Sequence, residues 1–232
     1  MFYYYGIDYS YIIYVLPAII FAMWAQIKVN STFKKYSRVP SDSGMTGADA
    51  AKMVLNQNGL YDVQVVEVKG NLTDHFDPRD NIIRLSESVY GVKSAAAVGV
   101  AAHEAGHAVQ YAEGYFPMQL RSAIIPITRI GSNLAFPLVL IGIIFSFSAL
   151  AYAGVILFGA SVLFQLVTLP VEFNASRRAL SSLESSGRLT EDGVTASRKV
   201  LSAAAMTYLA ALFVALGNML RLLSIVSRSR RD

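Results

Sequence analysis

A mainly α-helical integral membrane protein with a small α+β part is the fold class that this sequence predicts. Hydrophobic residues make up 54% of the 232 residues, charged residues only 16%, and the mean hydropathy is +0.43. This balance is typical of membrane proteins rather than of soluble domains. Long uncharged runs alternate with polar stretches, and one polar stretch, residues 28–93, carries both helix-like and strand-like patterns. We expect one domain over residues 1–232, with about four transmembrane helices.

The first uncharged run, residues 9–27, has 19 residues and is long enough to cross a bilayer. Pro17 predicts a kink in it. Residues 1–8 are aromatic and carry no Lys or Arg, so we expect an uncleaved anchor with an aromatic belt rather than a signal peptide. The basic residues that follow the run are Lys28, Lys34, Lys35 and Arg38. By the positive-inside rule, this end is cytoplasmic and the N-terminus lies outside.

The polar stretch over residues 28–93 predicts a small cytoplasmic α+β cap. Thr46-Gly47-Ala48-Asp49 has the pattern of a capping box, and the helix that it opens should end at Asn58-Gly59. Residues 61–69, 72–76 and 82–85 have strand-like patterns around a turn at 77–81.

Residues 130–171 hold no charged side chain over 42 positions, about twice the length of one span. We therefore expect a hairpin of two helices, 124–147 and 152–170, with its turn near 148–154. A hairpin returns the chain to the membrane face that it left. The polar, helical region 171–199 then lies on the same side as the cap, and Thr190 caps its second part.

The last uncharged run, residues 200–220, has 21 residues and predicts a fourth span. Four spans would place the basic tail, residues 228–232, outside the cell, against the positive-inside expectation. The alternative is a last helix that lies in the interface or re-enters the membrane. We favour four transmembrane helices.

Residues 94–112 predict a helix of small apolar residues that carries His103-Glu104-Ala105-Gly106-His107, an H-E-x-x-H motif. Residues four apart share one helix face, so His103 and His107 can bind one Zn²⁺. Glu104 lies beside the metal and can take a proton from a zinc-bound water. Two histidines and an acid in an Ala/Val helix are costly to bury without such a partner, which disfavours a purely structural helix.

Any metal site needs a third protein ligand, and the chain has no cysteine to supply it. Three candidates remain on sequence grounds. Glu172 follows the predicted hairpin, His75 lies in the predicted cap, and Glu113 follows the motif helix. The net charge of +4 does not indicate nucleic acid, because the basic residues cluster beside the spans.

The chain resembles the YugP-like family of bacterial membrane zinc metallopeptidases. The resemblance covers most of the chain and lies in five blocks: Lys34-Lys35-Tyr36-Ser37, Thr46-Gly47-Ala48, residues 72–79, Arg84-Leu85-Ser86 and residues 100–108. More distantly, the chain is similar to the HtpX and CAAX-protease group, in which a ligand Glu opens an E-x-x-A-D helix after a membrane hairpin. Residues 172–176 fit this pattern with Ser176 in place of the Asp, which leaves the partner of one histidine unassigned. The resemblance implies that Glu172 is the third zinc ligand and that the motif helix is zincin-like.

These observations predict a zinc-dependent endopeptidase that cleaves protein or peptide segments at the cytoplasmic face of the bacterial plasma membrane. His103, His107 and Glu172 would hold Zn²⁺, and Glu104 would activate water. The candidates for the donor that stabilises the oxyanion are His75, Asn174, Arg177 and Arg178. The expected partners are the lipid bilayer and a membrane-associated protein substrate. The alternative is a non-enzymatic scaffold whose metal site is structural or regulatory, closed by His75 as fourth ligand.

Overall fold

The computed structural model describes residues 8–229. The predicted aromatic belt at residues 1–7 and the end of the basic tail, residues 230–232, lie outside the described residues. The chain divides into two compact units. Within the described range, the first unit holds the residues up to 25, residues 120–169 and the residues from 207 on, and the second holds residues 26–119 and 170–206.

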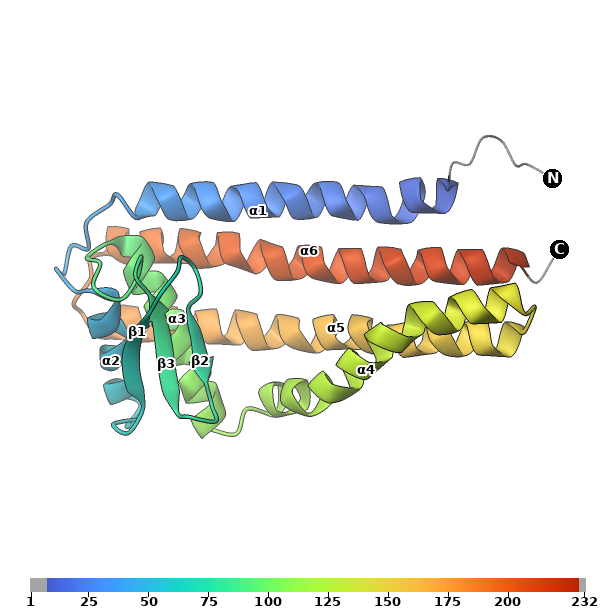
Figure 1. Cartoon of the computed structure of the whole chain (residues 1–232). Helices are drawn as coiled ribbons and strands as arrows, with labels where there is room; N and C mark the ends of the chain where they lie inside the picture. Colours follow the sequence, from blue (N-terminus) through green and yellow to red (C-terminus); the bar gives the residue numbers. More distant parts are fainter. Residues whose placement is uncertain (1–7, 230–232) are drawn as a thin grey trace. The chain divides into compact units, whose positions relative to one another are not determined.

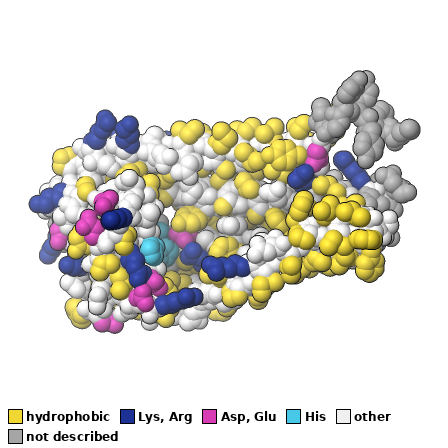
Figure 2. Space-filling view, in the orientation of Figure 1, with side chains coloured by type: hydrophobic (Ala, Val, Ile, Leu, Met, Phe, Trp, Pro, Cys, Tyr) yellow, Lys and Arg dark blue, Asp and Glu magenta, His cyan; other side chains and the backbone are white. Residues whose placement is uncertain are grey.

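Four helical segments of the described chain are long and apolar enough to cross a membrane, as the sequence predicted. The first is a π-helical turn, η1 (Tyr11–Val15), that continues into α1 (Leu16–Tyr36) (Figure 1). The others are α4 (Phe116–Ile144), α5 (Ser148–Ser185) and α6 (Glu191–Ser229). Figure 2 shows hydrophobic side chains along the helices of the first unit. Ile130, Phe136, Ile144 and Ile156 are each at least 60% exposed, as expected for side chains that meet lipid.

Two predictions about these helices need correction. The turn between the second and third spans lies at residues 145–147, not near 148–154, because Gly154 is a packing residue of α5 rather than a turn residue. A Cβ at Gly154 would lie 2.6 Å from the carbonyl oxygen of Ala135. Three of the helices, α1, α5 and α6, also extend well past the predicted span ends, whereas α4 ends at Ile144, before the predicted end at 147. Most notably, α5 continues through Pro170 to Ser185, since a proline inside a long helix removes only one backbone donor.

After the end of α1, the second unit continues with α2 (Gly47–Gln57), and the predicted capping box is present. The Thr46 hydroxyl accepts a hydrogen bond from the Asp49 N–H at 3.1 Å, and the Thr46 N–H donates to the Asp49 carboxylate at 3.0 Å. Asn58 is the C-cap, and Gly59 has a φ of +72°, a conformation that favours glycine.

A three-stranded sheet with the order β1-β3-β2 follows in the same unit. β1 (Gln64–Val68) pairs in parallel with β3 (Ile82–Ser86), and β2 (His75–Asp77) pairs with β3 in antiparallel orientation. The second predicted strand is thus shorter and later than residues 72–76, since Leu72 has a φ of +54°. β3 is central, and β2 is an edge strand.

The motif helix, α3 (Ala95–Ala112), contacts α2, β2 and β3 (Figure 1). Its small residues allow this close contact, and Ala97, Ala101 and Ala105 are completely buried. Together with Val54, Leu55, Ile83 and Leu85 they form the apolar core of the second unit. This core supports the helix that carries the two histidines.

Candidate metal centre

The local sequence explains why α3 begins and where it approaches its neighbours. Ser94 caps the helix, because its hydroxyl accepts a hydrogen bond from the Ala97 N–H at 3.2 Å. Gly106, between the two histidines, faces the backbone of α5, and a Cβ there would lie 2.6 Å from the Ala175 carbonyl oxygen. α3 and α5 therefore approach each other more closely here than side chains on both helices would allow.

This approach brings His103, His107 and Glu172 together. One ligand atom from each residue lies within 4.8 Å of the others. The Glu172 Oε2 atom is 3.2 Å from His103 Nε2 and 3.4 Å from His107 Nε2. The carboxylate that the sequence placed after the hairpin therefore reaches both rings, and Glu172 is only 3% exposed.

This donor set fits Zn²⁺. Two imidazole nitrogens and one carboxylate oxygen converge from the buried His107 and Glu172 and the half-buried His103, which is a known catalytic arrangement with a fourth position left open. A carboxylate and two rings are costly to bury unless a cation lies among them. Burial lowers the pKa of His107, but the hydrogen bond to Glu172 and the charge of Glu104 outweigh it, so that the pKa lies above its ordinary value.

Each ring uses its other nitrogen to contact a neutral side chain. His103 Nδ1 is 3.1 Å from the Ser176 hydroxyl, so Ser176 contacts the histidine at the position where the sequence pattern left the partner open. His107 Nδ1 is 3.0 Å from Gln110 Oε1. Sequence reasoning did not select Gln110. Its only signal was a polar side chain one helical turn after the second histidine in an otherwise apolar helix.

Glu104, which lies one helical turn before His107 on α3, is 9% exposed, and its charge acts on His107. Its Oε2 atom accepts a hydrogen bond from the Phe76 N–H of β2 at 3.1 Å. Asp74, just before β2, accepts hydrogen bonds from the Ser86 N–H and hydroxyl at 2.8 and 3.0 Å. Burial and the nearby charge of Glu104 raise the pKa of Asp74 despite these hydrogen bonds. β2 therefore runs beside the proposed reacting carboxylate.

The other candidate third ligands lie outside this group. His75 is exposed on β2, and its Nδ1 atom is 2.8 Å from the Thr73 carbonyl oxygen. Glu113 is the C-cap of α3 and forms an ion pair with Arg178 at 2.7 Å. In residues 8–229, no fourth His, Asp or Glu joins His103, His107 and Glu172.

The remaining predicted site residues follow Glu172 on α5. Asn174 Oδ1 accepts hydrogen bonds from Gln110 Nε2 at 2.9 Å and from Arg178 Nε at 2.7 Å. Arg177 is exposed. A groove of about 700 Å³ is lined by Asn174, Ser176 and Arg177, with Phe173 and Tyr115 among its other walls. This groove adjoins the residue that contacts His103.

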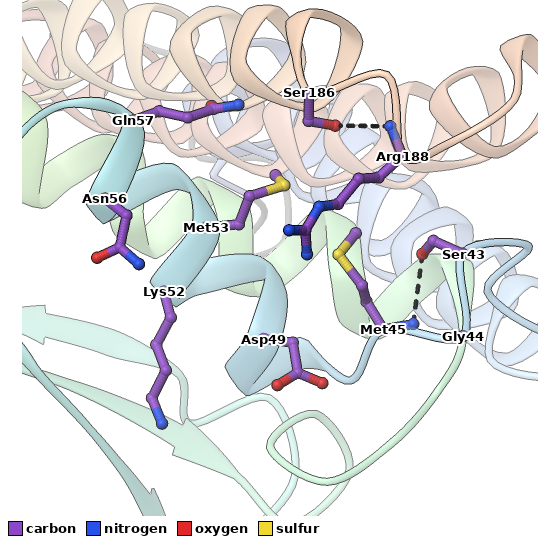
Figure 3. A pocket seen from close by; sticks show the side chains of 10 residues that line it. All are labelled: Ser43, Gly44, Met45, Asp49, Lys52, Met53, Asn56, Gln57, Ser186 and Arg188. Carbon is purple, nitrogen blue, oxygen red and sulfur yellow. Dashed lines mark hydrogen bonds between the residues drawn. The ribbon is translucent and has the colours of Figure 1, made fainter.

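A second cavity, of about 670 Å³, has a different character. Figure 3 shows Met45, Met53 and Arg188 pointing into it from the chain before α2, from α2 and from the chain after α5. It contains no histidine, and its single carboxylate, Asp49, belongs to the capping box. The metal-binding pattern is therefore confined to α3 and α5 in the described part of the chain.

The comparisons with known proteins agree with this geometry. A family model described as "Putative neutral zinc metallopeptidase" matches residues 11–227. The chain belongs to this family. It is also similar to "Putative membrane protease YugP" of Bacillus subtilis (strain 168), with 46% identity over 222 residues, 96% of this chain and 99% of that protein. No solved structure matches the chain. Family membership therefore indicates a zinc metallopeptidase. The four apolar helices and the similarity to a membrane protease indicate a membrane protein.

Proposed function

We propose that this chain is a zinc-dependent endopeptidase that cleaves protein segments at the cytoplasmic face of the bacterial plasma membrane. The proposal rests on one observation above all, the convergence of His103, His107 and Glu172 beside Glu104. These three residues would hold Zn²⁺. The expected substrate is a protein or peptide that reaches the site from the membrane surface.

Zn²⁺, when bound, acts as a Lewis acid that lowers the pKa of water to roughly 7 and polarises a carbonyl group. In the proposed reaction, the Glu104 carboxylate takes the proton from the attacking water and passes it to the amine that leaves. The Phe76 N–H holds one oxygen of Glu104 at 3.1 Å, which orients the carboxylate for this transfer. The low exposure of Glu104, 9%, limits competition from bulk water.

The sheet suggests how a peptide binds. Both edges of β3 are paired, so β3 cannot receive another strand, whereas β2 is paired only with β3. The outer edge of β2 faces Glu104, because the Phe76 N–H points to that carboxylate rather than to β3. An extended peptide that adds to β2 as a further strand would run past Glu104 and would bond to the backbone of β2 through groups other than the Phe76 N–H, which Glu104 occupies. The aromatic rings of Phe76 and Tyr111, 5.9 Å apart, would then border the peptide.

The donor that stabilises the oxyanion is proposed among His75, Asn174, Arg177 and Arg178. His75 lies on the edge strand, and Asn174 and Arg177 line the groove beside Ser176. The side chain of Arg178 is held by Asn174 and Glu113, which makes it less available than Arg177. Removal of such a donor typically costs about 10²- to 10³-fold in rate.

The rival function, a scaffold with a structural metal site, requires four protein ligands. The exposed position of His75 and its contact with Thr73 favour the enzyme, because the described residues offer three ligand groups. A metal site with three protein ligands keeps a position for water.

The decisive variant is Glu104→Gln, which keeps the shape of the side chain but removes the base. We expect it to retain zinc and to lose about 10²- to 10⁴-fold in peptide cleavage. The measurement is proteolysis by the purified full chain, with zinc content determined on the same sample. Cleavage by Glu104→Gln at the wild-type rate would refute the mechanism.

The membrane side can be tested separately, because the natural chain has no cysteine. Lys69 is exposed in the second unit, and Phe147 is exposed in the α4–α5 turn. A membrane-impermeant thiol reagent added to intact cells should label Phe147→Cys and spare Lys69→Cys. The opposite labelling pattern would place the site outside the cell.

A further inference from the structure

Gln110 is completely buried, and its side-chain amide makes three hydrogen bonds. Its Oε1 atom is 3.0 Å from His107 Nδ1. Its Nε2 atom donates to the Val171 carbonyl oxygen at 2.8 Å and to Asn174 Oδ1 at 2.9 Å. If a polar group of Gln110 were left unpaired in this buried position, it would carry a desolvation penalty. The partners of the amide therefore fix its orientation.

The orientation of this amide follows from its neighbours. A backbone carbonyl only accepts, so the NH₂ group of Gln110 must face Val171. Arg178 only donates, and its Nε lies 2.7 Å from Asn174 Oδ1, so the Asn174 amide also presents its oxygen to Gln110. Both partners independently assign the NH₂ group of Gln110 to α5 and its oxygen to the His107 ring.

The oxygen of Gln110 then requires a donor, which can only be a protonated Nδ1 of His107. In the neutral ring, the lone pair resides on Nε2, which is 3.4 Å from the Glu172 carboxylate. A lone pair and a carboxylate oxygen repel each other unless a cation lies between them. The chain of hydrogen bonds from Arg178 through Asn174 and Gln110 to His107 Nδ1 therefore leaves the lone pair of His107 on Nε2, where it can bind a metal ion.

We infer that Gln110 is a positioning residue for the metal centre, an inference that rests on the proposed function. It holds His107 in the Nδ1–H tautomer, with Nε2 free to bind zinc. It also ties α3 to Val171 and Asn174, the two residues that flank the Glu172 turn of α5. Such contacts to a ligand histidine typically contribute about 10- to 100-fold to metal affinity.

Two variants separate the two parts of this role. Gln110→Leu removes both the acceptor for His107 and the donor for α5. Gln110→Glu also removes the donor but keeps an acceptor for the ring. Gln57→Leu makes the same chemical change as the first variant at an exposed amide at the end of α2 and is the matched control.

The experiment measures zinc affinity by chelator competition on the purified full chain in detergent. We expect Gln110→Leu to bind zinc about 10- to 100-fold more weakly than wild type, Gln110→Glu to remain closer to wild type, and Gln57→Leu to be unchanged. Wild-type affinity in Gln110→Leu, or an equal loss in Gln57→Leu, would overturn the inference.

A second readout does not depend on loaded enzyme. The chain has only three histidines, so ¹⁵N NMR of histidine-labelled, zinc-free protein at alkaline pH reports each ring, and His107→Gln assigns the signal. Wild type should show His107 as the Nδ1–H tautomer, and Gln110→Leu should lose this preference. An Nε2–H ring in wild type contradicts the inference, even where Gln110→Leu fails to fold. Absence of zinc from wild type refutes the proposed function instead and leaves the tautomer result standing.

Discussion

The two units bring their helices together by the same means but use the contact differently. In the first unit, a Cβ at Gly142 would lie 2.4 Å from the Ala151 nitrogen, and one at Gly131 would lie 2.8 Å from the Leu157 oxygen. In the second unit, Gly106 makes the same kind of approach to Ala175. Only the second approach has buried polar side chains on both sides of it, including Gln110 and Glu172.

The difference shows that close helix packing is a general device, whereas the metal centre needs packing and polar partners together. Helix association within a membrane depends largely on small residues, because lipid supplies little hydrophobic driving force. In the second unit, the close approach at Gly106 sets the distance over which Glu172, Ser176 and Gln110 can reach the histidine rings. The predictions below separate the two contributions.

The largest effect is expected from Gly106→Ala. The new Cβ would lie 2.6 Å from the Ala175 oxygen, so α3 and α5 must separate and move the histidines away from Glu172. A shift of about 1 Å at a catalytic centre can cost about 100-fold in rate, and we expect weaker zinc binding as well. Peptide cleavage and chelator competition measure the two effects. Gly91→Ala, where no atom lies within 4 Å of the added Cβ, is the control and should behave as wild type.

Gly142→Ala should produce the opposite combination of effects. Its Cβ would lie 2.4 Å from the Ala151 nitrogen, and such overpacking typically costs about 1–3 kcal/mol of stability. Thermal unfolding in detergent should show this loss, while the zinc content per folded chain stays at the wild-type value. Gly159→Ala has open space around its Cβ and should not be destabilised. Loss of zinc in Gly142→Ala would mean that the two contributions are not separable.

A smaller effect is expected at the capping box of α2, which supports the core without contacting the metal centre. The Thr46 hydroxyl and N–H lower the pKa of Asp49 below its ordinary value of 3.8. Since the folded-state pKa is the lower one, the carboxylate stabilises the fold above pH 3.8, and this stabilisation is lost as the pH falls through the lowered value. Thr46→Ala should cost about 0.5–2 kcal/mol at pH 7. The difference from wild type should shrink on acidification below the ordinary pKa, and thermal unfolding at both pH values checks this.

Much of the fold follows from local sequence rules, and the departures have physical reasons. The capping box at Thr46, the motif helix and the four long apolar helices depend on patterns within a few turns of chain. The α4–α5 turn was misplaced because Gly154 serves helix packing. Sequence patterns also do not show which strand is central, and here β3 pairs on both sides while β2 is left at the edge.

The metal centre was also predictable in part, because some of its residues are related by local sequence patterns. His103 and His107 are related by helical spacing alone, and the hairpin placed Glu172 on the correct side. The contacts of Gln110 and Ser176 depend on the distance between α3 and α5, which Gly106 sets, and on the orientation of one amide. No pattern of residue types shows such contacts before the two helices are placed.

The most direct test of the account is the zinc content of the purified full chain beside that of Glu172→Gln, measured by mass spectrometry of the metal. The variant keeps the size of the side chain but replaces the proposed ligand carboxylate with an amide. We predict about one zinc ion per wild-type chain and a substantially lower content in the variant after dialysis. Wild-type protein without zinc, or a variant that retains the full amount, would contradict the proposal that His103, His107 and Glu172 form the metal centre.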